Sequence, residues 1–108
     1  MSHSLITSEK INEFNRGTIV EHLGIEITEV DGQTIKGKMP VDHRTIQSLK
    51  YLHGGASVVL AETLGSIGAT MQIDFPKEIC LGIEINANHI KSVRSGYVYG
   101  IASPIQIG

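Results

Sequence analysis

The stretch YLHGGASVVLAETLGSIGA, residues 51–69, decides the fold of this chain of 108 residues. After His53, Gly54 and Gly55 almost every residue is small or apolar, and the apolar positions run nearly all the way round a helical projection. This pattern indicates a helix that is buried on most sides. Its many Gly, Ala and Ser residues keep the helix thin, so it can lie close against a sheet or inside the curl of one. We therefore predict a helix from Gly54 or Gly55 to about Met71.

One carboxylate, Glu62, interrupts this apolar helix. An unpaired buried carboxylate is costly, and it is usually kept when it has a partner or a chemical task. About two turns earlier, the helix start at Gly54 or Gly55 presents backbone N–H groups that can bind an oxyanion. Ser66 follows Glu62 on the same face and can form a hydrogen bond near it. The pattern leaves two interpretations open: a catalytic Glu62, or a structural carboxylate bonded to a neighbouring strand or a second subunit.

The segments on either side of the helix predict antiparallel strands. Residues 23–30, LGIEITEV, alternate between apolar and polar, as a strand with one wet face does. Asp-Gly at 31–32 is a strong hairpin signal, and residues 33–40, QTIKGKMP, form the return strand up to its proline. Residues 78–90 and 97–103 predict two more strands. A short helix over 7–17 and a structured loop over 41–53 complete an α+β domain, in which an antiparallel sheet packs on one main helix.

Length and composition exclude several classes of protein. The 108 residues suffice for a single domain covering 1–108, and the net charge of −2 gives no general attraction to nucleic acid. Cys80 is the only cysteine, so we expect no internal disulfide and a reducing compartment. The first ten residues lack the layout of a signal peptide, and no apolar run is long enough to span a membrane. These features predict a soluble, cytoplasmic protein.

Two longer motifs carry a resemblance to a known family. VDHRTIQSLKYLHGGASVVLAETLGSIGA at 41–69 and GIEINANHIKSVRSG at 82–96 resemble the hotdog-fold acyl-CoA thioesterases. The most similar branch contains 1,4-dihydroxy-2-naphthoyl-CoA hydrolase, the enterobactin-pathway proofreading thioesterase, the 4-hydroxybenzoyl-CoA thioesterase of the Arthrobacter type and the PaaI-like proteins. The resemblance covers the chain from about residue 10 to its end. It implies a curved antiparallel sheet wrapped around the central helix.

The resemblance also implies which residues form the site. Glu62 matches the catalytic carboxylate, acting as nucleophile or general base, and a backbone N–H of Gly54 or Gly55 polarises the thioester carbonyl. The resemblance further implies that Gln47 and His53 hold the acyl part or the carbonyl, that Ser66 orients water, and that coenzyme A contacts Gly82, Ile83, His89, Lys91, Ser92 and Arg94. No metal and no separate cofactor are expected, because coenzyme A is part of the substrate. The family assembles as a homodimer or a dimer of dimers, with each active site across the dimer interface.

Two departures from the family bear on this expectation. Members continue past the position of Gly108 with two further strands, so we expect empty positions in the sheet and unpaired backbone groups beside them. Residues 48–51, SLKY, are bulkier and more charged than expected before His-Gly-Gly, which would alter the acyl pocket. Two other functions are therefore weighed: a non-catalytic domain that binds or senses acyl-CoA, and a hotdog dehydratase or hydratase. The dehydratase would be expected to carry a different Asp and His arrangement.

Overall fold

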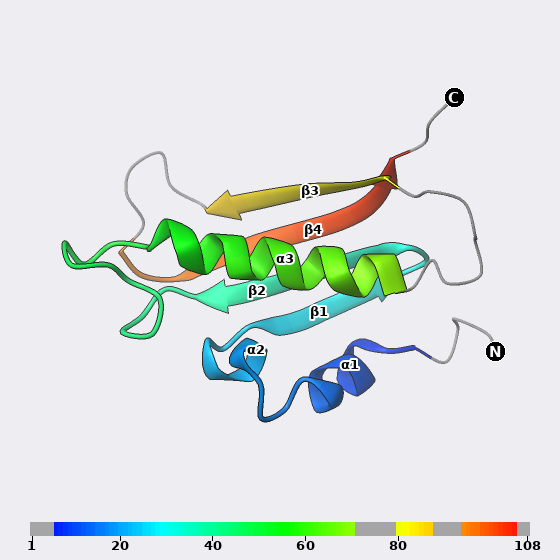
Figure 1. Ribbon diagram of the computed structural model, residues 1–108, viewed down its shortest axis with the longest axis horizontal. Helices are drawn as coiled ribbons and strands as arrows, with labels where there is room; N and C mark the ends of the chain where they lie inside the picture. The colour runs from blue at the N-terminus through cyan, green and yellow to red at the C-terminus, as the bar shows by residue number, and fades with distance from the viewer. Residues whose placement is uncertain (1–5, 71–79, 88–93, 106–108) are drawn as a thin grey trace.

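A computed structural model describes residues 6–70, 80–87 and 94–105. Three helices and four strands follow one another along the chain: α1 Ser8–Phe14, α2 Ile19–His22, β1 Glu26–Asp31, β2 Thr34–Pro40, α3 Gly54–Thr70, β3 Cys80–Ala87 and β4 Tyr97–Ile105. The long helix α3 lies across one face of the sheet, and α1 and α2 lie beside β1 (Figure 1). The predicted α+β class, the central helix and the hairpin are confirmed. Helix α2 was not predicted, and β4 extends two residues past the predicted strand.

The four strands pair in the order β1-β2-β4-β3, and all pairs are antiparallel. Strand β4 is hydrogen-bonded on both sides, since Gly100 pairs with Gly37 of β2 and with Ile85 of β3. The expectation of empty positions inside the sheet is therefore wrong for these four strands. Their ladder is continuous because β3 lies directly beside β4, so the backbone groups between them find partners. Gly32, with φ +62°, provides the positive φ that the tight β1–β2 turn requires.

Helix α3 buries one stripe and leaves the rest of its surface open. Its buried residues recur every fourth position, at Ala56, Leu60, Leu64 and Gly68. The predicted burial on most sides is wrong in this chain, because the sheet covers only one side of α3. Val58, on the opposite side, keeps 63% of its surface exposed, and Glu62 is exposed as well. An apolar helix with one uncovered side has room there for a ligand or another chain.

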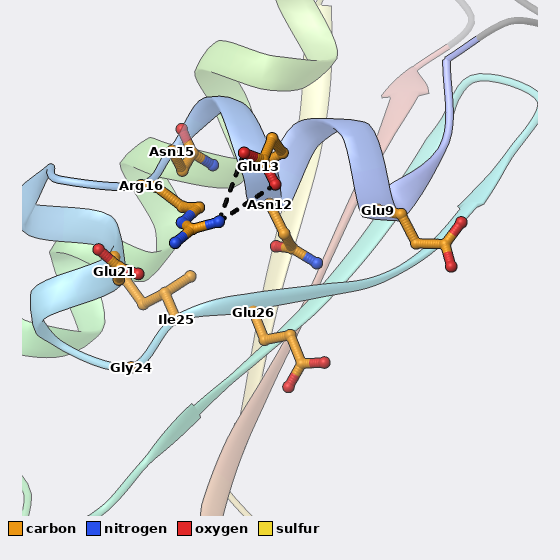
Figure 2. Close-up of a pocket in the computed structure, with 9 residues that line it drawn as sticks. All are labelled: Glu9, Asn12, Glu13, Asn15, Arg16, Glu21, Gly24, Ile25 and Glu26. Atoms are coloured by element: carbon orange, nitrogen blue, oxygen red, sulfur yellow. Dashed lines mark hydrogen bonds and ion pairs between the residues drawn. The ribbon is translucent and has the colours of Figure 1, made fainter.

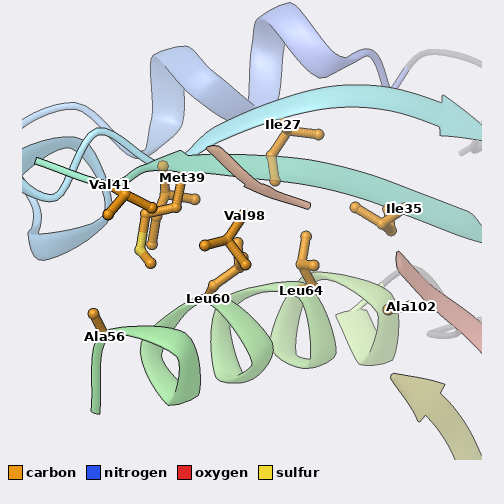
Figure 3. Close-up of a cluster of buried hydrophobic side chains, with 10 residues drawn as sticks. Ile27, Ile35, Met39, Val41, Ala56, Leu60, Leu64, Val98 and Ala102 are labelled. Carbon is orange, nitrogen blue, oxygen red and sulfur yellow. The ribbon is translucent and has the colours of Figure 1, made fainter. Parts of the chain in front are cut away.

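Leu64 packs against two glycines in the inner strands of the sheet. A Cβ atom added to Gly100 would lie 2.5 Å from one methyl carbon of Leu64, and a Cβ atom added to Gly37 would lie 3.0 Å from the other. These two glycines are paired across β2 and β4, so together they form a recess that receives the Leu64 side chain. Around this contact, Figure 3 shows the buried side chains of α3 meeting those of the sheet, including Ile27, Ile35, Met39 and Val98.

Helix α1 is fixed to the free edge of β1 by one side chain. The carboxamide oxygen of Asn12 accepts the N–H of Ile27 at 2.8 Å, and its nitrogen donates to the Ile27 carbonyl at 2.9 Å. Asn12 therefore satisfies the backbone groups that a further strand would otherwise use. The hydroxyl of Thr7 caps the helix by accepting the N–H of Lys10.

The loop that leads into α3 is held by side-chain hydrogen bonds. The guanidinium of Arg44 donates to Asp42 at 2.7 Å, and the backbone N–H of Arg44 donates to the same carboxylate at 2.9 Å. Thr45, which is 1% exposed, donates from its hydroxyl to the carbonyl of Pro40 at 2.8 Å. The N–H of His53 donates to the carbonyl of Thr45 at 2.8 Å, which ties this loop to the residue before α3. None of the helices in the described segments is long and apolar enough to cross a membrane.

The contact between Leu64 and the two glycines predicts a double-mutant result. Gly100→Ala should destabilise the fold by about 1–3 kcal/mol, because the new methyl group would overlap Leu64. Leu64→Ala alone should cost about 2–5 kcal/mol. In the Leu64→Ala background the same Gly100→Ala change should cost much less, because its main obstacle is gone. Urea unfolding of the four proteins measures this coupling, with Ser103→Ala on β4 as a control. Equal costs of Gly100→Ala in both backgrounds would show that Leu64 does not fill this recess.

The Asp42–Arg44 pair predicts a dependence of stability on pH. Hydrogen bonds from Arg44 lower the pKa of Asp42 from 3.8 to about 2. Because the folded-state pKa is lower than the unfolded one, the pair stabilises the fold above pH 3.8, and this contribution is lost as the pH falls toward about 2. Asp42→Asn should therefore lower the free energy of unfolding at neutral pH, and the difference from the parent should narrow between pH 4 and 2. Denaturant titrations over this range test it, with Asp31→Asn as the control. A difference that stays constant with pH would contradict it.

Candidate functional site

Glu62 lies on the side of α3 that points away from the sheet. It lines a hollow of about 460 Å³, whose other walls are small or apolar residues of α3 and one isoleucine of β3: Val58, Ala61, Gly65, Ser66, Ala69 and Ile83. Among the described residues of this lining Glu62 alone is ionisable, and it is exposed. The expectation of a buried carboxylate is thus wrong for the described part of the chain, in which no other element covers this side of the helix. The open position leaves the carboxylate accessible to a substrate.

Ser66 stands one turn after Glu62 in the same lining, as predicted. The structure places no hydrogen bond between the two side chains, which both face outward. Ser66 instead uses its backbone carbonyl to accept the hydroxyl of Thr70 at 2.9 Å.

The start of α3 is organised by His53. The Nδ1 atom of His53 accepts the N–H of Gly55 at 2.8 Å, so the imidazole serves as the cap of the helix. A Cβ atom on Gly55 would lie 2.9 Å from this ring, whereas a Cβ atom on Gly54 would meet nothing within 4 Å. Gly55 is therefore required by the capping ring. The bare backbone of Gly54 is open to the outside, where an approaching group can reach it.

Gln47 shapes the loop before the helix. Its side-chain oxygen accepts the N–H of Leu49, and its backbone N–H donates to the Tyr51 carbonyl at 2.9 Å. Lys50 at the tip has φ +75°, a conformation that a residue with a Cβ adopts only when its surroundings enforce it. In this structure the Gln47 side chain therefore stabilises the loop that precedes His53.

The helix start and Glu62 are separated along one helix. Glu62 follows Gly54 by eight positions, which corresponds to about 12 Å along the helix axis at 1.5 Å per residue. A single thioester cannot contact both points of one helix. The atom that attacks the thioester and the carbonyl oxygen that the helix start would polarise are bonded to the same carbon. The sequence predicted both the helix start and Glu62 as parts of the site. Within one chain they lie at two separate positions along α3.

The segment predicted to bind coenzyme A is only partly described. Ile83 of β3 lines the Glu62 hollow, and Gly82 pairs with Ser103 further from it. The guanidinium of Arg94 lies over the ring of Tyr51, 5.5 Å from its centroid, and is exposed. The structure thus brings Arg94 beside the loop that leads into α3. The predicted contacts His89, Lys91 and Ser92 lie outside the described residues.

A separate hollow of about 460 Å³ lies between α1, α2 and the start of β1 (Figure 2). Four carboxylates line it, from Glu9, Glu13, Glu21 and Glu26, and Arg16 is its only cation. Arg16 points to Glu13, whose carboxylate oxygens are 3.4 Å away. The excess of negative charge disfavours a polyanion such as coenzyme A. This hollow shares no residue with the lining around Glu62, so we do not count it as part of the candidate site.

Several wall residues were missed by sequence reasoning. Val58, Ala61 and Ala69 look like ordinary helix residues, and only their spacing relative to Glu62 could have placed them on its face. Ile83, which the resemblance places at the coenzyme A surface, lines the hollow beside Glu62. Among the described residues, no three His, Cys, Asp or Glu side chains gather closely enough to hold a metal ion.

Comparison with known proteins identifies the fold and the family. The chain is 56% identical over 91 residues to the Bacillus subtilis protein ComA2, which corresponds to 84% of this chain and 72% of that protein. It is 42% identical over 103 residues to 1,4-dihydroxy-2-naphthoyl-CoA hydrolase of Escherichia coli, covering 95% of this chain and 75% of the relative. These matches span nearly all of the elements described above.

Solved structures agree with the sequence matches. The crystal structure of thioesterase HI1161 from Haemophilus influenzae superposes with a TM-score of 0.74 at 43% identity, covering 95% of this chain and 71% of that one. A mutant of thioesterase PA1618 from Pseudomonas aeruginosa gives a TM-score of 0.75 at 38% identity, covering 96% of this chain and 75% of that one. Residues 49–108, which include α3 and its glycine-rich start, match the Thioesterase superfamily. The chain is therefore a member of the thioesterase superfamily, with the hotdog arrangement of sheet and central helix.

Proposed function

We propose that this protein hydrolyses the thioester bond of an acyl-CoA whose acyl part is aromatic or of related character, with Glu62 as the catalytic carboxylate. The observation that carries the proposal is the position of Glu62. Of the described residues around an accessible hollow, it is the one ionisable group, and the other walls are small or apolar. Such walls suit an acyl group, and a lone carboxylate among them is available for chemistry.

The proposed reaction needs only the groups that the chain supplies. Glu62 either removes a proton from water, whose oxygen then attacks the thioester carbon, or attacks that carbon itself to form an anhydride that water opens. In both cases negative charge develops on the carbonyl oxygen, and the C–S bond breaks to release a thiolate that takes up a proton. The N–H of Gly54, at the start of α3, is suited to stabilise the developing oxyanion, while the N–H of Gly55 donates to His53.

The separation of these two elements favours a site built from two chains. Because about 12 Å of helix lies between Gly54 and Glu62, we propose that the helix start of one copy and the Glu62 of another act on the same thioester. The uncovered side of α3, with its 63% exposed Val58, offers a surface against which a second copy can pack. A homodimer or a dimer of dimers would bring the two halves of the site together.

We propose roles for the remaining predicted residues from their positions. Gln47 and His53 flank the helix start, where we propose that they hold the substrate carbonyl or the adjacent acyl atoms. Arg94 is exposed beside Tyr51 and is proposed to pair with a coenzyme A phosphate, as are Lys91 and Ser92 in the same segment. Gly82 and His89 are proposed to adjoin the same nucleotide.

Glu62→Gln should remove most thioesterase activity and leave the fold intact. The change keeps the shape of an exposed side chain and removes only its charge and basicity, so we expect a loss on the order of 10²-fold or more in kcat with little change in unfolding midpoint. Release of free thiol from a panel of acyl-CoAs, together with urea unfolding, measures both effects. Glu84→Gln is the matched control, since that exposed glutamate lies on β3 outside the hollow. Full turnover by Glu62→Gln would remove Glu62 from the mechanism.

The two glycines at the start of α3 should respond differently to alanine. Gly54→Ala adds a methyl group in open space, so the stability of the fold should hold, while access of the thioester to the helix start should fall. Blocking an oxyanion donor costs up to about 10²–10³-fold in kcat. Gly55→Ala should also displace the His53 ring and lower stability, because its Cβ would lie 2.9 Å from the imidazole. Paired measurements of kcat and melting temperature separate the two. Unchanged activity of Gly54→Ala would exclude its backbone from the site.

A further inference from the structure

Phe14, at the end of α1, is 87% exposed even though it is one of only two phenylalanines in the chain. Burial of a phenylalanine side chain normally stabilises the fold by about 1.5–3 kcal/mol, so a phenylalanine exposed to water contributes little of this free energy. Its neighbour Ile11 does pack against the core, which shows that α1 has an apolar side of its own. The packing of α1 against the core therefore does not explain why Phe14 is exposed.

Phe14 lines a hollow of about 550 Å³ between α1 and the last turns of α3, which we name the α1 groove. Its walls are largely apolar and are formed by two segments, Ile6, Lys10, Ile11, Phe14 and Asn15 on one side and Ser66, Ile67 and Thr70 on the other. The volume falls within the range of about 300–1,000 Å³ that is usual for small-molecule sites. Lys10 is the only ionisable residue in the described part of this lining, and none of these wall residues is a carboxylate that could receive a cationic group.

The α1 groove adjoins the hollow around Glu62 at Ser66. Among the described residues, Ser66 alone lines both spaces. Since Ser66 lies one turn beyond Glu62, a group that starts at the Glu62 carboxylate must extend about 6 Å along the helix to enter the groove. An acetyl group, with a single methyl beyond its carbonyl carbon, is too short to do so. An aromatic or medium-chain acyl group is long enough.

The wall that carries Phe14 is rigidly placed. Asn12, two residues earlier, binds both backbone groups of Ile27 at 2.8 and 2.9 Å, and this fixes α1 to the edge of the sheet. Helix α3 rests on the two inner strands of the same sheet, β2 and β4, through Leu64. The width of the groove is therefore set by the fold, and a preformed apolar space selects ligands by size and shape.

From these observations, and resting on the proposed function, we propose that the α1 groove binds the acyl group of the substrate and that Phe14 determines which acyl groups are accepted. The occupant is an uncharged aromatic or medium-chain acyl group attached to the thioester at Glu62. Phe14 is a specificity-determining residue in this proposal, because it contacts the acyl group at a distance from the reacting atoms.

A comparison of substrates tests the role of Phe14. Phe14→Ala should lower kcat/KM for octanoyl-CoA and benzoyl-CoA by about tenfold or more, since a missing apolar contact of this size costs roughly 10–200-fold in discrimination. The value for acetyl-CoA should change less than about twofold, and Phe14→Leu should restore much of the lost activity toward the larger substrates. Ile19→Ala is the matched control, because Ile19 is also exposed, at 59%, on the neighbouring helix α2 but lines neither space.

A second measurement detects occupancy without turnover. The chain contains no tryptophan, so Phe14→Trp introduces a single fluorescent reporter into the groove, and Ile19→Trp introduces one outside it. Both are made together with Glu62→Gln, so that acyl-CoA is not consumed. Octanoyl-CoA should change the fluorescence of the Phe14→Trp protein in a saturable way, whereas acetyl-CoA and free coenzyme A should leave it unchanged. The Ile19→Trp protein should respond to none of the three.

The outcomes separate this inference from the proposed function. Equal effects of Phe14→Ala on all acyl-CoAs, or a response of the reporter to coenzyme A alone, would overturn the assignment of the groove. A reporter signal that follows protein concentration instead of ligand, with a change in sedimentation for Phe14→Ala, would assign the groove to a second copy of the chain and overturn it too. If the parent hydrolyses no acyl-CoA while octanoyl-CoA still saturates the reporter, the thioesterase proposal fails and the groove is supported as an acyl-binding site.

Discussion

The insertion of Leu64 between two paired glycines is the contact on which the remaining structure depends. Gly37 and Gly100 lie side by side on adjacent strands, and the absence of both Cβ atoms lets α3 approach the middle of the sheet. Glycine weakens a strand, so its presence in two neighbouring central strands has a cost. Close packing of Leu64 offsets that cost, because a buried leucine gains many dispersion contacts. This close contact between α3 and the sheet fixes the positions of the remaining residues of α3.

The direction of Glu62 follows from this contact. Leu60 and Leu64 point into the sheet, so the residues on the opposite side of the helix, Glu62 among them, must point outward. The same geometry places Ser66 next to Glu62 and directs Ile67 and Thr70 toward α1. The packing of the core thus places the carboxylate in the hollow bounded by β3, and the groove bounded by α1 adjoins this hollow at Ser66. The chemistry that we propose uses both the outward carboxylate and these walls.

Side-chain hydrogen bonds fix the borders of the site. His53 caps α3, the Asp42–Arg44 pair and Thr45 hold the preceding loop, and Asn12 holds α1 to the sheet edge. Each of these polar side chains satisfies backbone or charged groups that would otherwise be left without partners. The result is a set of rigid borders around an open helix face. This arrangement is suited to binding, because the borders are already in place before a ligand arrives.

The sequence by itself determined the order of the elements, the hairpin at Asp31-Gly32, the long helix from Gly54 and the family to which the chain belongs. These depend on local patterns of period two and period 3.6, on turn glycines and on motifs, all of which can be read along the chain. It also singled out Glu62 as the unusual residue of α3. Only the tertiary structure decided which side of that apolar helix meets the sheet, because a helix that is apolar all round carries no stripe to orient it. The pairing of β3 with β4, the exposure of Glu62 and the α1 groove are all long-range consequences of that choice.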